Sequence, residues 1–248
     1  MATLTCGFWN IHGHKSDMVG DKLCDPEFLD IVKNVDIVGL GEIHAEVKVS
    51  IPGFVNKDQK IRVKNFSGPK IAGGIGVFVR TEIEHLVERV DNKNENSIWV
   101  KIKKEKTNEK EDIYVGTYYV SPENSKELSK DFNFFSEIND EVSHFSKKGI
   151  VLIQGDLNCR TGDDSDYVEG DKSDDYFGIE NFSNQNKRNS EDKTKNARGI
   201  ELLDVCKLND LLILNGRTTG DVFGKYTNHN WNGSSVVDYF LAPNYFFD

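Results

Sequence analysis

Apolar residues gather along this chain in short runs, and the length and composition of these runs predict many strands and few helices. The runs are rich in β-branched or aromatic residues and are bounded by glycine or polar residues, as strands are. Residues 35–42 (VDIVGLGE) are almost continuously apolar, which indicates a strand buried on both faces. The predicted strands span residues 3–9, 35–42, 72–80, 83–90, 97–104, 112–120, 149–155, 211–216 and 235–242.

Three segments have helical spacing instead. Residues 26–34 place Phe28, Ile31 and Val32 on one face. A second helix is predicted to begin with Ser125 as its cap and to end in the basic turn before Gly149. Residues 199–208 predict a short amphipathic helix. The sequence contains no internal repeat and no recognisable interdomain linker.

Two polar stretches predict surface loops. Residues 106–111 separate two predicted strands, as a hairpin loop does. Residues 159–198 include NQNKRNSEDKTKN (184–196), which has no apolar period and is expected to be a surface loop that orders on demand. This loop holds the concentrated basic run of the sequence, which either grips a nucleic-acid backbone or is a solvated loop. The run consists of Lys187, Arg188, Lys193, Lys195 and Arg198.

Composition excludes several classes of protein. A chain of 248 residues with 37% hydrophobic content buries a sizeable core, so disorder of the whole chain is not expected. The formal net charge of −10 argues against a protein that coats nucleic acid by charge alone, because phosphate contacts need clustered Lys and Arg. Any contact with nucleic acid must therefore be local or assisted by a metal ion.

The cysteines and the apolar runs indicate where the protein acts. Cys6, Cys24, Cys159 and Cys206 have no C-x-x-C spacing, so we expect reduced thiols of an intracellular protein rather than a zinc site. No window approaches the ~18 apolar residues of a membrane span, and the N-terminus lacks the pattern of a secretory signal. We expect a soluble protein without a membrane partner.

Polar side chains stand where several of the predicted strands end. Asn10 follows the first strand, Glu42 ends the strand 35–42, and Asp156 and Asn158 follow the strand 149–155. In layered α/β folds, ligands bind at this edge of the sheet. Carboxylate and amide oxygens suit Mg²⁺ or Mn²⁺ better than Zn²⁺, and such an ion leaves positions open to water and phosphate. For Asp156 alone, an Asx turn that closes the strand is the alternative.

These residues lie in segments that resemble the ordered motifs of the endonuclease/exonuclease/phosphatase superfamily. The spacing is similar to that of its abasic-site endonuclease-like branch, and most closely to the endonuclease domain that opens the reverse-transcriptase polyprotein of LINE-type non-LTR retrotransposons. GGIGVFVR, GDLNCRTG, ARGIELLDVCKLNDLLILNGR and SSVVDYFL are also similar to such elements, and the resemblance covers residues 4–243. The motifs are FWNIHG with Asn10, GLGEIH with Glu42, TYYVSP with Tyr119, GDLN at 155–158 and SVVDYF with Asp238.

The resemblance implies a fold and a metal site. The fold would be a DNase I-like, four-layered α/β sandwich, in which two mostly antiparallel twisted sheets pack face to face with helices outside. It would form a single domain over residues 1–248. Glu42 would be the principal ligand of Mg²⁺ or Mn²⁺, and Asn10 would lie close to the metal and to the attacked phosphate.

The resemblance also implies the roles of the other motif residues. Tyr119 would hydrogen-bond the phosphate as its charge develops, whereas Tyr118 would point the other way because side chains alternate along a strand. Asp156 would orient or deprotonate the attacking water, and the amide of Asn158 would hold a phosphate oxygen. Asp238 would orient a catalytic histidine.

Further residues are candidates for contact with nucleic acid. His44 follows Glu42 closely, so it touches nucleic acid or a metal, or else is a solvated loop histidine. Asn230 and Trp231 fall in a loop that could probe DNA shape or stack on a base. Thr227 and Ser235 resemble residues that line the cleft in retrotransposon relatives, although local bonds to the backbone are the alternative. Lys187 and Arg188 of the basic run complete the candidates.

One part of the family pattern is missing from the sequence. In the family, the histidine that Asp238 orients lies in a Ser-Asp-His motif before the last strand, and no histidine follows His229 here. We expect a fragment of a longer polyprotein, an inactive derivative, or replacement by His229. Loss of the last strand would leave a sheet edge uncovered and open to self-association.

Two classes of function follow from these expectations. The first is a Mg²⁺-dependent DNA endonuclease that leaves a 3′-hydroxyl able to prime reverse transcription, acting in the nucleus next to the reverse transcriptase of the same polyprotein. The second is a binding module that has kept the fold without catalysis. Within the enzyme class, a phosphatase or an RNA nuclease of the same superfamily is the alternative.

Overall fold

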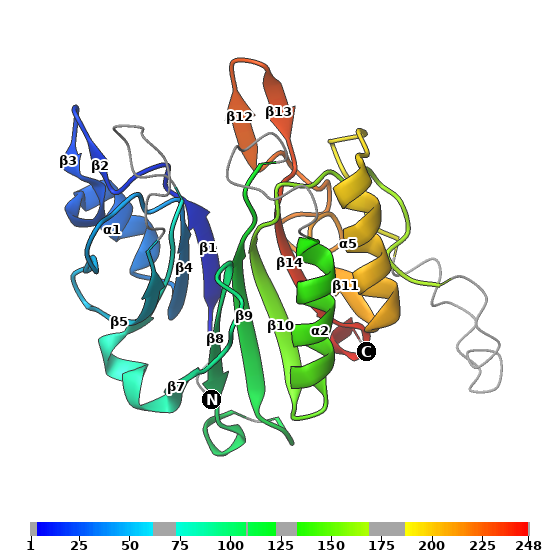
Figure 1. Cartoon of the computed structure of the whole chain (residues 1–248), viewed down its shortest axis with the longest axis horizontal. Helices are drawn as coiled ribbons and strands as arrows, with labels where there is room; N and C mark the ends of the chain where they lie inside the picture. Colours follow the sequence, from blue (N-terminus) through cyan, green and yellow to red (C-terminus); the bar gives the residue numbers. More distant parts are fainter. Residues whose placement is uncertain (1–3, 62–72, 108, 123–132, 169–186, 248) are drawn as a thin grey trace. The chain divides into compact units, whose positions relative to one another are not determined.

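The computed structural model of the chain describes residues 4–61, 73–107, 109–122, 133–168 and 187–247, and it consists of two compact units (Figure 1). The first unit contains Met1–Leu128 and Phe145–Leu157, and the second contains Ser129–His144 and Asn158–Asp248. Each unit is described in turn. No helix in the described ranges has the length and apolar character needed to cross a membrane.

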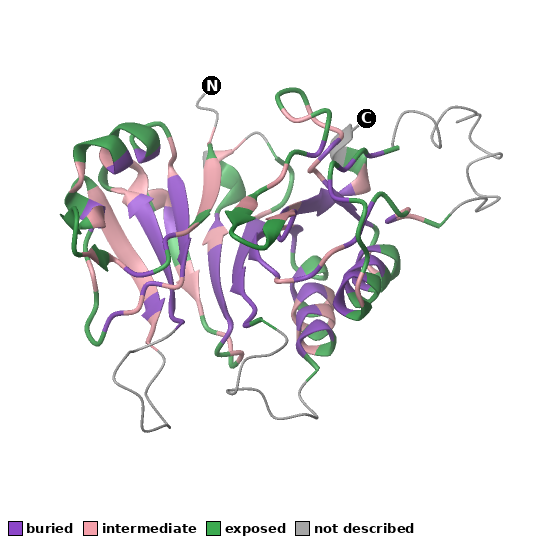
Figure 2. Cartoon of the chain, turned by 90° about the horizontal axis from the view of Figure 1, so that it is seen from above, coloured by how far each residue is buried: buried purple, intermediate pink, exposed green. Residues whose placement is uncertain are grey.

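Two sheets form the first unit. In the first sheet the order is β1 (Cys6–Asn10), β4 (Ile37–Gly41), β6 (Ile75–Arg80) and β5 (Phe54–Lys60). In the second, the strands of this unit follow the order β10 (Ile150–Asp156), β9 (Ile113–Tyr119), β8 (Ser97–Ile102) and β7 (Val87–Val90). The pairs β1–β4 and β9–β10 are parallel, and the other pairs are antiparallel. Strands β4, β6, β8, β9 and β10 are mostly buried, whereas most residues of β1, β5 and β7 are of intermediate exposure or exposed (Figure 2).

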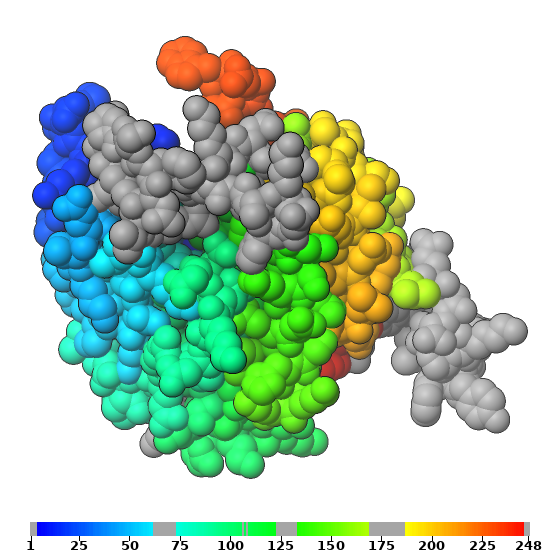
Figure 3. Space-filling view, in the orientation of Figure 1, coloured from blue at the N-terminus to red at the C-terminus, as the bar shows by residue number. Residues whose placement is uncertain are grey.

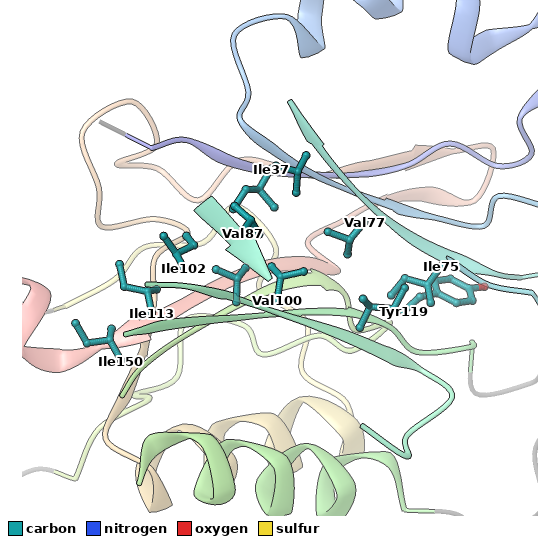
Figure 4. Packing of buried hydrophobic residues seen from close by; sticks show 12 residues of the cluster. Ile37, Ile75, Val77, Val87, Val100, Ile102, Ile113, Tyr119 and Ile150 are labelled. Carbon is teal, nitrogen blue, oxygen red and sulfur yellow. The ribbon is translucent and has the colours of Figure 1, made fainter. Parts of the chain in front are cut away.

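The sheets pack face to face through apolar side chains. Val77 of β6 and Val100 of β8 belong to one buried cluster that joins both sheets, together with Tyr119 of β9 (Figure 4). Because side chains alternate along β4, Ile37 enters this cluster while Val38 faces the opposite side. The prediction that this strand is buried on both faces is confirmed.

A helix covers the outer face of the first sheet. In α1 (Pro26–Val32), Phe28 and Val32 pack in a second cluster that includes Val38. The prediction that Ile31 shares this face is wrong, because Ile31 is exposed. Asp25 caps the helix by accepting hydrogen bonds from the N–H groups of Glu27 and Phe28. Helix, sheet and second sheet therefore form successive layers, and the expected α/β fold of sheets flanked by helices is confirmed.

Short elements connect these layers, and one of them corrects a prediction. The first half of the predicted strand 83–90 is the 3₁₀ helix η2 (Thr81–Leu86), and β7 begins only at Val87. Ile83 and Leu86 pack on the core between the sheets, which explains their apolar character without a strand. The other short elements are β2 (Lys15–Ser16), β3 (Gly20–Asp21), η1 (Lys22–Cys24) and η3 (Lys104–Lys106).

The second unit combines helices with short strands. The helix α2 (Phe134–Ser146) lies almost wholly in it, followed by α5 (Ala197–Leu208) and η4 (Asn244–Phe247). Strand β11 (Leu211–Ile213) pairs antiparallel with β14 (Asp238–Pro243). Strands β12 (Asn228–Asn230) and β13 (Gly233–Ser235) form a hairpin that projects from the surface (Figure 3).

The second unit differs from the sequence predictions at two places. The predicted strand 235–242 is divided, because β13 ends at Ser235 and β14 begins at Asp238. Among the described residues α2 begins at Phe134, where Asn133 accepts hydrogen bonds from two backbone N–H groups. The predicted cap Ser125 lies outside the described residues, as do Asn108 of the predicted hairpin loop and residues 169–186 of the predicted polar loop 159–198.

The rest of the polar loop is held in place, contrary to the prediction of a loop that orders on demand. Asp192 is buried and accepts hydrogen bonds from Arg160, from the N–H of Thr194 and from the N–H of Val236. One carboxylate thus ties together three segments that have no regular secondary structure.

Candidate active site

Four polar side chains of the first unit meet where four strands end. Asn10 is the last residue of β1, and Glu42 follows the last residue of β4. Tyr119 ends β9 directly opposite Asp156, which ends β10. Because β1 is parallel to β4 and β9 is parallel to β10, the carboxyl ends within each pair coincide. The predicted gathering of Asn10, Glu42 and Asp156 is therefore observed, and Tyr119 joins these three residues.

Asn10 is the centre of this cluster. Its Nδ2 donates to Glu42 Oε1 over 3.1 Å and to Asp156 Oδ2 over 2.8 Å. The hydroxyl of Tyr119 donates to the same Glu42 oxygen over 3.0 Å. One amide thus lies between two carboxylates that belong to different sheets, and its two N–H donors offset their mutual repulsion.

The second oxygen of Glu42 faces histidines. His12 Nδ1 lies 2.9 Å from Oε2, and His44 Nε2 lies 3.5 Å from it. Burial raises the pKa of Glu42, but hydrogen bonds from Asn10, His12 and Tyr119 outweigh burial and hold the pKa below its ordinary value. The carboxylate is therefore ionised at neutral pH. Burial lowers the pKa of His44 and outweighs the opposite influence of Glu42.

The backbone around the cluster has an uncommon conformation. His12, Glu42 and His44 have positive φ angles of 45°, 50° and 52°. Non-glycine residues adopt this region rarely, and such outliers gather at functional sites. Hydrogen bonds hold the conformation: Asn10 Oδ1 accepts from the N–H of His12 over 3.0 Å, and the carbonyl of Glu42 accepts from the N–H of Gly13 over 2.7 Å.

The donor set fits a hard cation such as Mg²⁺. Within the described part of the chain, no three or more His, Cys, Asp or Glu side chains are arranged to hold a metal by themselves. Mg²⁺ does not need such a set, because proteins commonly hold it through one or two carboxylates plus waters and substrate phosphate. The ionised Glu42, with Asp156 close by, meets that requirement.

Other predicted site residues lie in the second unit. Asn158 has a positive φ of 44°. The N–H of Asp238 donates to Thr227 Oγ1 over 3.1 Å, and the N–H of Thr227 donates to the carbonyl of Ser235 over 3.0 Å. The Thr227 hydroxyl thus makes the local backbone contact that was the alternative to a role in the cleft, and it fixes the start of the strand that carries Asp238.

Two predicted nucleic-acid contacts stand on the β12–β13 hairpin. Asn230 and Trp231 occupy its tip, where the N–H of Asn232 donates to Asn230 Oδ1 over 2.8 Å. The side chain of Trp231 is fully exposed. A large aromatic ring presented to solvent on a short hairpin is available for stacking.

The prediction of an exposed basic run is wrong for Arg188. This residue is 3% exposed, and its guanidinium donates to Thr161 Oγ1 over 2.9 Å and to the carbonyl of Asp164 over 3.3 Å. Lys193 pairs with Asp163, so acidic partners also reduce the positive charge of the run. Lys187 is exposed and keeps its predicted accessibility.

Sequence reasoning missed His12 and Lys22 as parts of the site. Lys22 Nζ donates to the carbonyl of Ile11 over 2.7 Å and to that of His12 over 3.3 Å, which fixes the turn after Asn10. The signal for His12 was its place two residues after Asn10 in FWNIHG. Lys22 gave no signal, because its contact depends on the path of the intervening β2–β3 hairpin.

Comparisons with known proteins bear on the fold. The sequence matches no protein-family model and no curated protein. Among solved structures, it is similar to the 3′-5′ exonuclease NExo from Neisseria meningitidis, with 14% identity, a TM-score of 0.55, and coverage of 97% of this chain and 87% of that chain. The 3′ phosphatase NExo from Neisseria, bound to product DNA hairpin, gives 14% identity, a TM-score of 0.57 and the same coverage.

A further similar structure is an endonuclease/exonuclease/phosphatase family protein from Leptotrichia buccalis. It is 11% identical, with 97% of this chain and 88% of that chain covered, and its TM-score of 0.46 is too low to establish a shared fold by itself. The two NExo structures do establish it. The chain has the DNase I-like α/β fold of these enzymes.

Proposed function

We propose that the protein is a metal-dependent phosphodiesterase of the endonuclease/exonuclease/phosphatase superfamily, and that it is a Mg²⁺-dependent DNA endonuclease. One observation carries the proposal: Asn10, Glu42, Tyr119 and Asp156 converge at the strand ends through hydrogen bonds of 2.8–3.1 Å. A partly buried group of two carboxylates, an amide and a phenol is suited to a cation and a phosphate rather than to an apolar ligand.

Each residue of this cluster would have a separate role in hydrolysis. Glu42 and Asn10 would hold Mg²⁺ or Mn²⁺, which when bound neutralises charge on the phosphate. Asp156 would be the proton acceptor for the attacking water, because its carboxylate lies 2.8 Å from the Asn10 amide that also contacts Glu42. Tyr119 presents an O–H that can donate to a phosphate oxygen as its charge develops.

The finer assignment is retrotransposition. The ordered motifs resemble those of LINE-type endonuclease domains, which supports cleavage of chromosomal DNA in the nucleus to leave a 3′-hydroxyl for a reverse transcriptase in the same polyprotein. Trp231 and Asn230 on the exposed hairpin would contact the DNA. Because the net charge is −10, we expect these local contacts and the cation to provide binding, rather than a large basic surface.

A second candidate is processing of a DNA end. The two NExo structures are of a 3′-5′ exonuclease and of a 3′ phosphatase bound to product DNA hairpin. This similarity supports a DNA terminus as the alternative substrate of the same cluster. RNA is a third class of substrate. The chemistry at the phosphorus is shared, so the substrate distinguishes the candidates.

Cleavage of supercoiled plasmid tests the proposal. The purified chain is incubated with Mg²⁺ or Mn²⁺, with EDTA and the Glu42→Gln variant as controls, and nicked circles are measured. We expect nicking that requires the metal and is lost in the variant. Parallel reactions contain a 3′-phosphorylated DNA duplex and a single-stranded RNA.

Each outcome decides between the candidates. Nicking of circular DNA supports the endonuclease, since a circle has no terminus. Activity restricted to the 3′-phosphorylated duplex or to RNA supports the alternative substrate classes. Absence of metal-dependent hydrolysis on every substrate, with a folded protein, contradicts the proposal and indicates a binding module.

A further inference from the structure

A pair of histidines beside the proposed active site has the features of a separate transition-metal site. The chain contains six histidines, and His12, His14 and His44 lie on the two segments that hold Glu42 in place. The segment FWNIHG continues to His14, so His12 and His14 flank Gly13. The proposed function uses neither His12 nor His14.

One ring nitrogen of each of these two histidines is already engaged. His12 Nδ1 lies 2.9 Å from Glu42 Oε2, and His14 Nδ1 lies 3.0 Å from the carbonyl oxygen of Ile43. An ionised carboxylate and a carbonyl can only accept hydrogen bonds. In each neutral ring the proton is therefore on Nδ1, and Nε2 carries a free lone pair.

This arrangement is the one that protein metal sites use. A histidine that binds a metal almost always donates its other ring N–H to a carboxylate or a backbone carbonyl, which fixes the tautomer and the ring orientation. His12 has the carboxylate and His14 has the carbonyl. The two rings thus have their outer hydrogen bonds in place before any ion arrives.

The backbone between the rings is also fixed. Gly13 has a φ of +88°, which only glycine adopts without strain, and its N–H donates to the carbonyl of Glu42 over 2.7 Å. The N–H of His14 donates to the carbonyl of Ile43 over 2.9 Å. His12 and His14 are two positions apart, so their Cα atoms lie at most about 7 Å from each other. Both imidazole rings can therefore reach one ion.

Solvent reaches the pair. The side chain of His12 is 87% exposed, and His14 is partly exposed. Imidazole nitrogen is a softer ligand than carboxylate oxygen and favours Zn²⁺, Co²⁺, Ni²⁺ and Cu²⁺ over Mg²⁺. The site therefore differs in its metal preference from the oxygen cluster of Asn10, Glu42 and Asp156.

We propose that His12 and His14 bind a divalent transition-metal ion such as Zn²⁺ through their Nε2 atoms, with water or phosphate in the remaining positions. Two protein ligands agree with the finding that no larger set of His, Cys, Asp or Glu side chains is prearranged among the described residues. The inference stands independently of the proposed nuclease, because it depends on histidine geometry alone.

Titration of the full chain with Zn²⁺ by calorimetry, and with Co²⁺ by visible absorption, tests the site. The variants His12→Asn and His14→Asn are the sharpest choices, because asparagine keeps an N–H donor toward Glu42 or Ile43 and lacks a second nitrogen ligand. The control is His85→Asn, which changes an exposed histidine on η2. Circular dichroism verifies that every variant is folded.

We expect about one ion per chain, with a Kd raised at least 10-fold in His12→Asn and in His14→Asn and unchanged in His85→Asn. A large excess of Mg²⁺ should leave Zn²⁺ bound. Wild-type affinity in both folded variants would overturn the site. Displacement by Mg²⁺, or loss of binding in Glu42→Gln alone, would instead place the ion at the oxygen cluster and likewise overturn it.

Discussion

Tyr118 and Tyr119 are adjacent on β9, but they face opposite sides of the strand and have different neighbours. Tyr119 points toward the first sheet and donates to Glu42 Oε1 over 3.0 Å. Tyr118 is fully buried on the other face, where its ring meets Trp99 edge to face with centroids 6.0 Å apart. Alternation along a strand gives these two rings different neighbours although their chemistry is the same.

Removal of the Tyr119 hydroxyl should reduce catalysis more than stability. Tyr119→Phe keeps the ring in the core and loses one hydrogen-bond donor at the phosphate site. We expect a fall in kcat of roughly 10²-fold, as for other lost donors to a transition-state oxygen. The free energy of unfolding should fall by about 0.5–1.5 kcal/mol. Plasmid nicking and urea denaturation measure the two effects.

Tyr118→Phe is the matched control for that substitution. It removes the same atom from the neighbouring ring, on the face of the strand away from Glu42. Its kcat should stay close to that of the wild type. Equal losses of kcat in the two variants would contradict a specific role for Tyr119.

At this scale the sequence predicts some residues well and others not at all. Glu42 and Asp156 were found because each stands at the end of a recognisable strand. Tyr119 was found because its motif resembles that of the superfamily, and alternation along the strand separates it from Tyr118. Arg188 was placed wrongly because its partner, Thr161, is 27 residues distant and nothing local marks the contact. A basic residue in a polar segment gives the same sequence pattern whether its side chain is solvated or buried.

Among the strands, β4 depends on a glycine where the two sheets approach each other. A Cβ atom at Gly39 would lie 2.5 Å from Thr117 Cγ2 and 3.0 Å from Phe8 Cδ2. Thr117 is fully buried and its Oγ1 accepts a hydrogen bond from Gln154 Nε2 over 3.1 Å. Close packing here positions β4, which delivers Glu42, against β9, which delivers Tyr119.

Gly39→Ala should therefore destabilise the first unit, and a second substitution should restore part of the loss. Overpacking of this kind costs about 1–3 kcal/mol. Thr117→Ser removes the clashing Cγ2 while keeping the hydroxyl, so Gly39→Ala/Thr117→Ser should be more stable than the sum of the single variants. Urea unfolding of all four proteins measures this coupling. Strict additivity would show that Thr117 does not limit the space at Gly39.

The hairpin β12–β13 is the element best placed to test DNA contact apart from catalysis. Trp231→Ala changes a fully exposed side chain, so the free energy of unfolding should move by less than about 0.5 kcal/mol. Loss of base stacking should weaken DNA binding by about 1–3 kcal/mol. Fluorescence anisotropy in the Glu42→Gln background measures binding without cleavage.

Phe223→Ala supplies the comparison for the hairpin. Phe223 is also an exposed aromatic residue of the second unit, and it lies outside β12 and β13. Its replacement should leave DNA binding unchanged. If both variants bind DNA as tightly as the parent, the hairpin tip does not contact the nucleic acid.

The long apolar strands could be predicted, whereas the short hairpins could not. Strands such as β4 and β10 are buried and have a continuous apolar signal. Strands β12 and β13 have the sequences NHN and GSS, in which no apolar residue alternates with a polar one. Their pairing follows from backbone hydrogen bonds and the turn at residues 231–232, so hydrophobic periodicity does not predict it.

On the scale of the whole molecule, acidic residues outnumber basic ones by 41 to 31, and folding shifts several of their pKa values. The ordinary values are 3.8 for Asp and 4.5 for Glu, and the pKa values of Glu42, Glu84, Glu88, Asp163 and Asp192 lie below them in the folded protein. The pKa of Glu137 is raised because burial disfavours its charge. More groups therefore favour the folded state when they are ionised than when they are protonated.

Stability should consequently fall in acid, and Asp192 should account for a measurable part of that loss. A group with a lowered folded pKa contributes stability above its unfolded pKa, and loses it as the pH falls through the folded pKa. Unfolding midpoints in urea should change little between pH 7 and pH 5 and then decline below about pH 4.

Asp192 has the best-defined cause for such a shift. Burial raises its pKa, but bonds from Arg160 and from the N–H groups of Val236 and Thr194 outweigh burial and lower it. Asp192→Asn should cost about 1.5–3 kcal/mol at pH 7, because it weakens hydrogen bonds to a charged acceptor. The difference from the wild type should shrink below the folded pKa, where Asp192 itself becomes protonated. A difference that stays constant from pH 7 to pH 3 would show that the ionised carboxylate does not hold these loops together.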